Sequence, residues 1–302
     1  MDKSKLMGNM FLLLTSLIWG LAFVAQRVGM DYVGPLTFTA VRFWLGAAVL
    51  LPLLYYTEKK NSAKDAEEKA ISTLLAGGIC GAIIFIASIL QQYGLVFTTA
   101  GKAGFITALY IVIVPILGLA MKQRPGAKSW IGVALGSIGL YFLTITDSFT
   151  IARGDFVVLV GAFFWAAHVL SIDRFNPYVD SIKLSITQFT VCAILATIGM
   201  FIFETPSIGS IVNGAIPILY SGILSCGAGF TLQIFGQKHT TPTVASLILS
   251  MEAVFGAIFG FLILKEIMSI KELFGCFFMF TAVIISQLPG KIKSSSDLIN
   301  DD

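Results

Sequence analysis

The sequence predicts an all-α integral membrane protein with ten transmembrane helices, arranged as two inverted five-helix repeats. Three observations support this fold class: an apolar composition, ten long apolar windows, and a sequence segment that recurs 142 residues further along the chain. The 302 residues are 56% hydrophobic and 12% charged, with mean hydropathy +0.87, whereas soluble domains have roughly 25% charged residues. Windows such as 71–92 contain no charge and could not form a solvated surface.

The ten windows follow from the thickness of a membrane, because about 20 apolar residues are needed to cross a hydrocarbon layer of ~30 Å. Windows of that size lie at 9–28, 35–56, 71–93, 99–121, 128–146, 154–173, 182–203, 213–236, 242–264 and 271–289. Turn and charge signals such as Gly34-Pro35 and Thr241-Pro242 bound them. None shows the strict alternation of a β-barrel strand.

The N-terminus has a basic start and an apolar run, so a signal peptide must be weighed against a first helix. The run continues to Val28 without a small-x-small cleavage site, which favours a membrane helix.

Lys and Arg in the loops predict the orientation, since cytoplasmic loops carry an excess of both. With the N-terminus inside, fourteen of the 20 lie in inner segments, five in outer segments and Arg42 within a helix. We therefore expect both termini to be cytoplasmic, in a multi-pass protein of the plasma membrane.

Other function classes have little support in the sequence. The four cysteines, Cys80, Cys192, Cys226 and Cys276, lie in apolar windows with no metal-ligand spacing. A net charge of +3, spread along the chain, does not suggest nucleic acid. No nucleotide or hydrolase motif is present, and we expect no cofactor and no enzymatic activity.

A repeated sequence segment divides the chain into two halves. Leu90–Ile106 matches Leu232–Ile248 at seven of seventeen positions. Six further identities occur at an offset of 146: Gly8, Leu13, Trp19, Tyr32, Val33 and Phe43 match Gly154, Leu159, Trp165, Tyr178, Val179 and Phe189.

Residues 1–146 and 147–302 therefore form the two predicted repeats. Because five is odd, the second copy enters the bilayer from the opposite side. Such inverted repeats are typical of secondary transporters, in which substrate binds near the midplane between the repeats. A duplication with a purely structural role would leave the same trace.

Three stretches resemble the EamA-like family of the drug/metabolite transporter superfamily. They are Trp19–Pro52, Thr98–Gly118 and Thr240–Glu266. The resemblance implies ten helices in two inverted halves around a central cavity, and transport of small metabolites, often outward, without ATP hydrolysis. Where family members often have Glu-Pro in the ninth span, this chain has Glu252-Ala253, which weakens any mechanism that needs a proline break there.

Two residues at equivalent positions of the repeats are candidates for the centre of the site. Glu252 lies ten residues after Pro242, about 15 Å along a helix and hence at the midplane. An ionisable group at that depth costs at least ~2.5–3.5 kcal/mol and is a functional candidate. It could exchange protons, bind a cationic group, or be a protonated structural residue. Its repeat mate is Tyr110.

Arg42 lies about 10 Å into the second span. Its planar fork could hold a substrate carboxylate or phosphate, or it could pair with a carbonyl or with Glu252. The equivalent residue of the other half is Gln188. Lys102, in the first turn of the fourth span, could line an outer vestibule or extend to lipid headgroups.

The remaining candidates are aromatic, imidazole and amide side chains. His168 could titrate near neutral pH, although a neutral histidine bonded to a backbone carbonyl is the simpler explanation. Trp19 and Trp165 are repeat mates that could stack on a planar or cationic substrate or only pack. Gln92, with Gln91 and Gln233, could line the pathway or bond between helices.

These features together predict a membrane-embedded secondary transporter that works by alternating access, with lipid and a small-molecule substrate as partners and protons as a coupling ion. Export of amino acids or related amphipathic solutes is the first interpretation. Import of a nucleoside-like or S-adenosylmethionine-like solute fits the same residues. A channel and an integral-membrane enzyme are the other classes considered, and the oligomeric state is left open.

Overall fold

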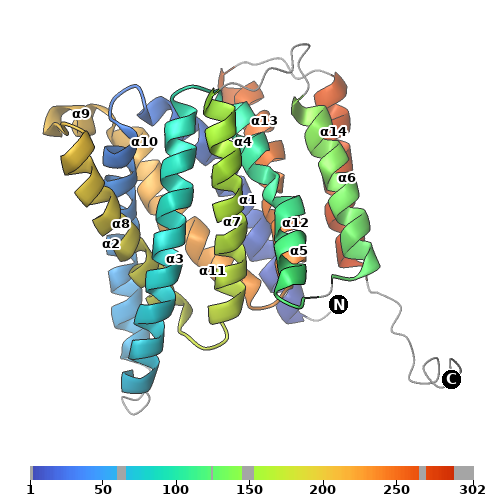
Figure 1. Ribbon diagram of the computed structural model, residues 1–302, viewed down its shortest axis with the longest axis horizontal. Coiled ribbons are helices and arrows are strands. Elements are labelled where there is room, and N and C mark those ends of the chain that lie inside the picture. The colour runs from blue at the N-terminus through green and yellow to red at the C-terminus, as the bar shows by residue number, and fades with distance from the viewer. Residues whose placement is uncertain (1–2, 60–65, 124, 145–152, 265–269, 289–302) are drawn as a thin grey trace, which may run out of the picture.

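The computed structural model describes residues 3–59, 66–123, 125–144, 153–264 and 270–288, and this part of the chain is helical without strands. The helices run side by side along one direction, with α6 and α14 together at one edge (Figure 1). In chain order they are α1 (Lys3–Gly29), α2 (Pro35–Glu58), α3 (Ala66–Leu95), α4 (Ala100–Ala108), α5 (Tyr110–Ala120), α6 (Ala127–Thr144), α7 (Arg153–Phe175), α8 (Ser181–Phe203), α9 (Ile208–Asn213), α10 (Ala215–Leu219), the π-helix η2 (Tyr220–Phe230), α11 (Thr231–Gln237), α12 (Pro242–Leu249), α13 (Met251–Leu264) and α14 (Ile270–Gln287).

Eight helical segments within the described ranges are long and apolar enough to cross a membrane. Three of them are composite: α4 with α5, then α10 with η2 and α11, and lastly α12 with α13. The other two predicted windows are occupied by α6 and α14, and the apolar stretch Leu273–Ser286 of α14 is shorter than a full crossing. The protein is therefore a multi-pass membrane protein, while ten crossings stay a prediction.

The fourth and ninth predicted spans are interrupted at equivalent positions. α4 gives way to α5 at Leu109, directly before Tyr110, and α12 gives way to α13 at Ser250, two residues before Glu252. No proline occupies the second break; instead the hydroxyls of Ser246 and Ser250 donate back to carbonyls three residues earlier. Such bonds compete with the helical ladder, so this span is interrupted even though Ala253 stands where family members often have proline.

Helix pairing follows a pattern that repeats when the two halves are exchanged. α2 packs against α8, and α6 packs against α14, so each pairs with the helix at its own position in the other half. α3 packs along α7, and correspondingly η2 and α11 pack along α1. Exchanging the two halves therefore leaves the pattern of these helix–helix contacts unchanged.

Glycines permit the same close helix crossing in each half. A Cβ on Gly94 of α3 would lie 2.9 Å from the carbonyl oxygen of Gly154 in α7. A Cβ on Gly236 of α11 would also lie 2.9 Å from the carbonyl oxygen of Gly8 in α1. These four glycines are two pairs of repeat mates, so the identities in the sequence mark two equivalent crossings.

The α2–α8 pair is tied at both ends by carboxylates. At the start of α2, Glu204 accepts hydrogen bonds from the backbone N–H groups of Leu36 and Thr37 at 2.8 and 2.9 Å, and from the Thr37 hydroxyl at 2.6 Å. The N-cap there is Gly34, which has no side chain to do this, and a Cβ on Gly34 would collide with the Glu204 carboxyl group. The cap of α2 is thus supplied by the end of α8.

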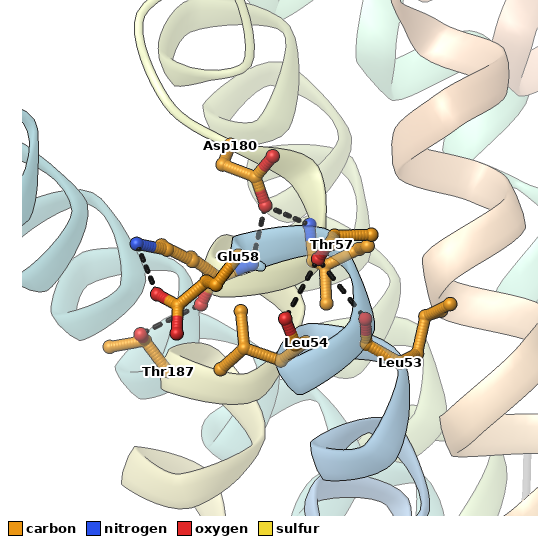
Figure 2. A network of polar contacts seen from close by, with 8 residues as sticks. Leu53, Leu54, Thr57, Glu58, Asp180 and Thr187 are labelled. Carbon is orange, nitrogen blue, oxygen red and sulfur yellow. Dashed lines mark hydrogen bonds and ion pairs between the residues drawn. The ribbon is translucent and has the colours of Figure 1, made fainter. Parts of the chain in front are cut away.

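The opposite end of the pair is built differently (Figure 2). Asp180, the repeat mate of Gly34, caps its own helix by accepting from the N–H groups of Ile182 and Lys183. The Lys183 ammonium is then paired at 2.7 Å with Glu58, the repeat mate of Glu204, and both side chains are partly exposed.

This difference predicts unequal stability effects for two equivalent residues. Glu204→Ala should lower the stability by about 2 kcal/mol, because it removes the cap of α2 and leaves buried donors unpaired. Glu58→Ala should cost no more than about 0.5 kcal/mol, since it breaks a partly exposed ion pair. Thermal unfolding of the purified protein in detergent would measure both; equal losses would contradict the assignment of the cap.

Candidate functional site

A small cavity lies between helices of the two predicted repeats. Its space for the centres of water molecules is about 30 Å³, which is room for very few waters. It is lined by Trp19, Phe23, Gln26, Arg42, Gln91, Thr107, Trp165, Ser225, Phe230 and Glu252. Five of the residues considered in the sequence, Trp19, Arg42, Gln91, Trp165 and Glu252, therefore meet at one place.

One wall of the cavity is aromatic. The Trp165 ring stacks on Phe230 with centroids 5.9 Å apart and an interplanar angle of 18°, and Trp19 contacts Phe230 at 4.7 Å. The two tryptophans lie 6.5 Å from each other. Their indole N–H groups are both satisfied, by the Ser225 carbonyl and by Gln91 Oε1. The rings are thereby fixed in orientation on the wall of the cavity.

Phe230 and Ser225 reach this wall because the backbone of η2 is π-helical. Hydrogen bonds from i to i+5 widen the turn and shift the register of side chains relative to an α-helix, and such segments often occur at functional sites. Glycines also allow a close approach: a Cβ on Gly229 would lie 2.7 Å from the Trp19 indole nitrogen.

An amide network forms another side of the cavity. Gln91 donates to Gln26 Oε1 at 3.0 Å and accepts from Trp165 at 2.8 Å and from Thr107 at 3.3 Å. Gln92 lies behind this layer, where it donates to the backbone carbonyl of Gln26. Gln91, rather than Gln92, therefore faces the cavity.

Glu252 is 3% exposed and close to its repeat mate Tyr110, which is equally buried. The carboxyl group and the phenol are near enough to interact, yet neither Glu252 Oε1 nor the Tyr110 hydroxyl has a partner with hydrogen-bond geometry. A buried carboxyl without a fixed cationic or amide partner is free to bind a proton or a ligand cation.

Arg42 is also 3% exposed, and its guanidinium carbon lies over the rings of Phe38 and Phe43 at 5.6 and 5.1 Å. Among the described residues it makes no ion pair with Glu252 or any other carboxylate, and its Nε has no hydrogen-bond acceptor. The expected structural pairing is therefore absent from this part of the chain.

Three further predicted residues lie outside the cavity lining. Lys102 is 3.4 Å from Asp155 of α7, so it joins two helices near the end of the bundle. His168 is fully buried and bonds at 2.9 Å to the side chain of Gln188, in place of the backbone carbonyl that we expected. The His168 ring contacts Trp165 and Phe230 edge-on, with centroids 6.1 and 5.9 Å away, so the His168–Gln188 pair supports the aromatic wall.

Sequence reasoning missed several lining residues. Phe23 and Gln26 follow Trp19 by four and seven positions, so helical spacing from Trp19 could have found them. Phe230 had no such signal, because its position depends on the π-helical register of η2.

A family model supplies the identification. The model of the EamA-like transporter family matches this chain twice, over residues 6–145 and 152–287. The chain belongs to the EamA-like transporter family. Its curated relatives include an uncharacterized transporter of Archaeoglobus fulgidus, 30% identical over 94% of this chain and 87% of the relative. The uncharacterized transporter YoaV of Bacillus subtilis is 27% identical over 86% and 89%.

The fold is also found in a solved crystal structure, with a TM-score of 0.74 at 17% identity, covering 93% of this chain and 96% of the other. That similarity concerns the fold alone. As a member of the EamA-like family this protein is a membrane transporter and not an enzyme, with the bilayer and a small-molecule substrate as its partners.

Proposed function

We propose that this EamA-like protein is a secondary carrier that exports small amphipathic metabolites, amino acids first among them, by alternating access. The observation that carries the proposal is the central cavity, where two buried ionisable groups, Arg42 and Glu252, accompany an aromatic wall. An α-amino acid offers a carboxylate and an ammonium to such a pair.

Two inverted repeats, 1–146 and 147–302, are part of this proposal. The double match of the family model supports them, as do the exchange symmetry of the helix contacts and the two Gly–Gly crossings. Ten crossings with both termini in the cytoplasm follow from an odd number of spans per repeat and from the excess of Lys and Arg in the inner segments.

Alternating access is favoured by the size of the cavity. A space of about 30 Å³ for water centres leaves little room for an amino acid with a side chain, so we expect the helices to separate when a substrate enters. The interrupted α4–α5 and α12–α13 spans beside Tyr110 and Glu252 resemble the discontinuous helices that form carrier sites.

Proteoliposomes loaded with a mixed pool of amino acids, nucleosides and other metabolites would test the proposal. Mass spectrometry would follow what leaves, with and without an imposed pH gradient, and protein-free liposomes would serve as the control. Selective and saturable loss of amino acids is the expected result. Selective loss of nucleosides alone would replace the substrate class, and loss without selectivity or saturation would contradict a carrier.

A further inference from the structure

We propose that Arg42 is a carboxylate-binding group, so that the ligand of the central cavity must carry a carboxylate. This inference rests on the proposed function for its biological meaning, but its test measures binding alone. Three observations support it: the burial of the guanidinium, its lack of an acceptor, and its position on the cavity wall.

Arg42 remains charged, because a guanidinium cannot be deprotonated under ordinary conditions. A buried cation without a partner is costly, and buried charges are normally paired. The rings of Phe38 and Phe43 attract the cation, but a ring face leaves the directional N–H donors unsatisfied.

The neighbours of Arg42 do not supply the missing anion. The ionisable groups beside it are the thiols of Cys192 and Cys226, which are neutral at pH 7 when unperturbed. Glu252 lines the same cavity without forming an ion pair with Arg42. No described side chain therefore supplies the acceptor, and Arg42 faces a cavity in which a ligand could supply it.

The chemistry of the donor selects the class of ligand. A planar guanidinium presents parallel N–H groups that match the two oxygens of a carboxylate. A small carboxylate such as acetate occupies little more space than the few waters that the cavity can hold, so a minimal probe can bind without opening the helices.

The protein carries its own reporters for this binding. Of its four tryptophans, Trp19 and Trp165 line the cavity, whereas Trp44 and Trp130 are 44% and 36% exposed on the outer surface of the bundle. In a Trp44→Phe/Trp130→Phe background the remaining fluorescence comes from the cavity.

The experiment titrates the purified full-length protein in this background with formate and acetate, and with the neutral isosteres formamide and acetamide, at constant ionic strength. We expect a saturable fluorescence change with the carboxylates, at least about tenfold weaker with the amides. Arg42→Gln should weaken carboxylate binding by at least about tenfold, while Arg27→Gln, at an exposed i,i+4 pair, should leave it unchanged.

Arg42→Lys keeps the positive charge but loses the planar guanidinium, so it separates the effect of charge on binding from the effect of hydrogen-bond geometry. Equal responses to carboxylates and amides in the Arg42-containing protein would overturn the proposal, whether or not the variants fold. A response to inorganic phosphate in place of carboxylates would overturn it as well. If carboxylates bind but the proteoliposomes carry nothing, the proposed function fails and this inference stands. Selective transport without carboxylate binding would overturn this inference and leave the carrier function standing.

Discussion

Glu252→Gln should abolish the dependence of transport on an imposed pH gradient. Glu252 is the one acidic residue that lines the central cavity within the described part of the chain, and its Oε1 has no fixed partner. Glutamine keeps the size and polarity of the side chain but cannot release a proton. A carrier that moves one proton per cycle gains about 1.4 kcal/mol, or about tenfold accumulation, for each pH unit of gradient, and the variant should lose this gain.

The measurement is accumulation of substrate in proteoliposomes at matched inner and outer pH and with one pH unit across the membrane. Exchange of labelled for unlabelled substrate needs no net proton movement, and the glutamine amide oxygen can still accept from a substrate ammonium. Exchange should therefore persist in Glu252→Gln at saturating substrate, with weaker binding, and show that the variant is folded. Glu58→Gln, which alters an exposed carboxylate at the end of α2, is the matched control. Full gradient dependence in Glu252→Gln would mean that the coupling proton binds elsewhere.

The part of the site that could be predicted from the sequence is the part that depends on depth within a helix. Trp19, Arg42, Trp165 and Glu252 were selected because polar or aromatic residues lie far from both ends of their spans, and all four line the cavity. Depth along a helix follows from residue number, since each residue advances the chain by about 1.5 Å.

The direction in which a side chain points around the helix axis is harder to predict in these spans. When every face of a helix is apolar, periodicity does not indicate which side points inward. Gln91 and Gln92 are adjacent, yet one faces the cavity and the other lies behind it. Lys102 was ambiguous for a related reason, because its partner Asp155 begins a helix of the other repeat.

Local changes of helix type were also outside the reach of the sequence. The π-helical run of η2 places Phe230 at the centre of the aromatic wall. No residue pattern in the sequence predicts this π-helix. The break at Ser250 coincides with a side-chain hydroxyl that bonds back to the helix, and no proline marks it in the sequence.

The repeated glycines lead to the second large prediction, which is that equivalent substitutions should favour opposite conformations. Gly94 and Gly154 close the crossing at one end of the bundle, and Gly236 and Gly8 close its equivalent at the other end. Both crossings are closed here, and each tolerates no Cβ without movement. A valine at one crossing should separate the helices at that end only, at a cost of about 1–3 kcal/mol.

Such a cost shifts the ratio of two conformations by about 5–150-fold. With both termini in the cytoplasm, as proposed above, Gly94→Val destabilises closure at the outer end and Gly236→Val destabilises closure at the inner end. The measurement uses a protein without the four native cysteines and with one new cysteine in place of Ser225, which lines the cavity. The rate at which a membrane-impermeant maleimide, added outside, labels this cysteine reports how accessible the cavity is from the outside. Labelling should become faster in Gly94→Val and slower in Gly236→Val.

The comparison of the two variants isolates the mechanism, because both introduce the same side chain at equivalent Gly–Gly contacts. General loosening of the bundle would speed labelling in both, and a rigid channel would leave both rates unchanged. Opposite responses require that opening at one end be linked to closure at the other, which is what alternating access demands of two inverted repeats around one site. The recurrence of these glycines in the sequence would then reflect a requirement of the transport cycle as well as of helix packing.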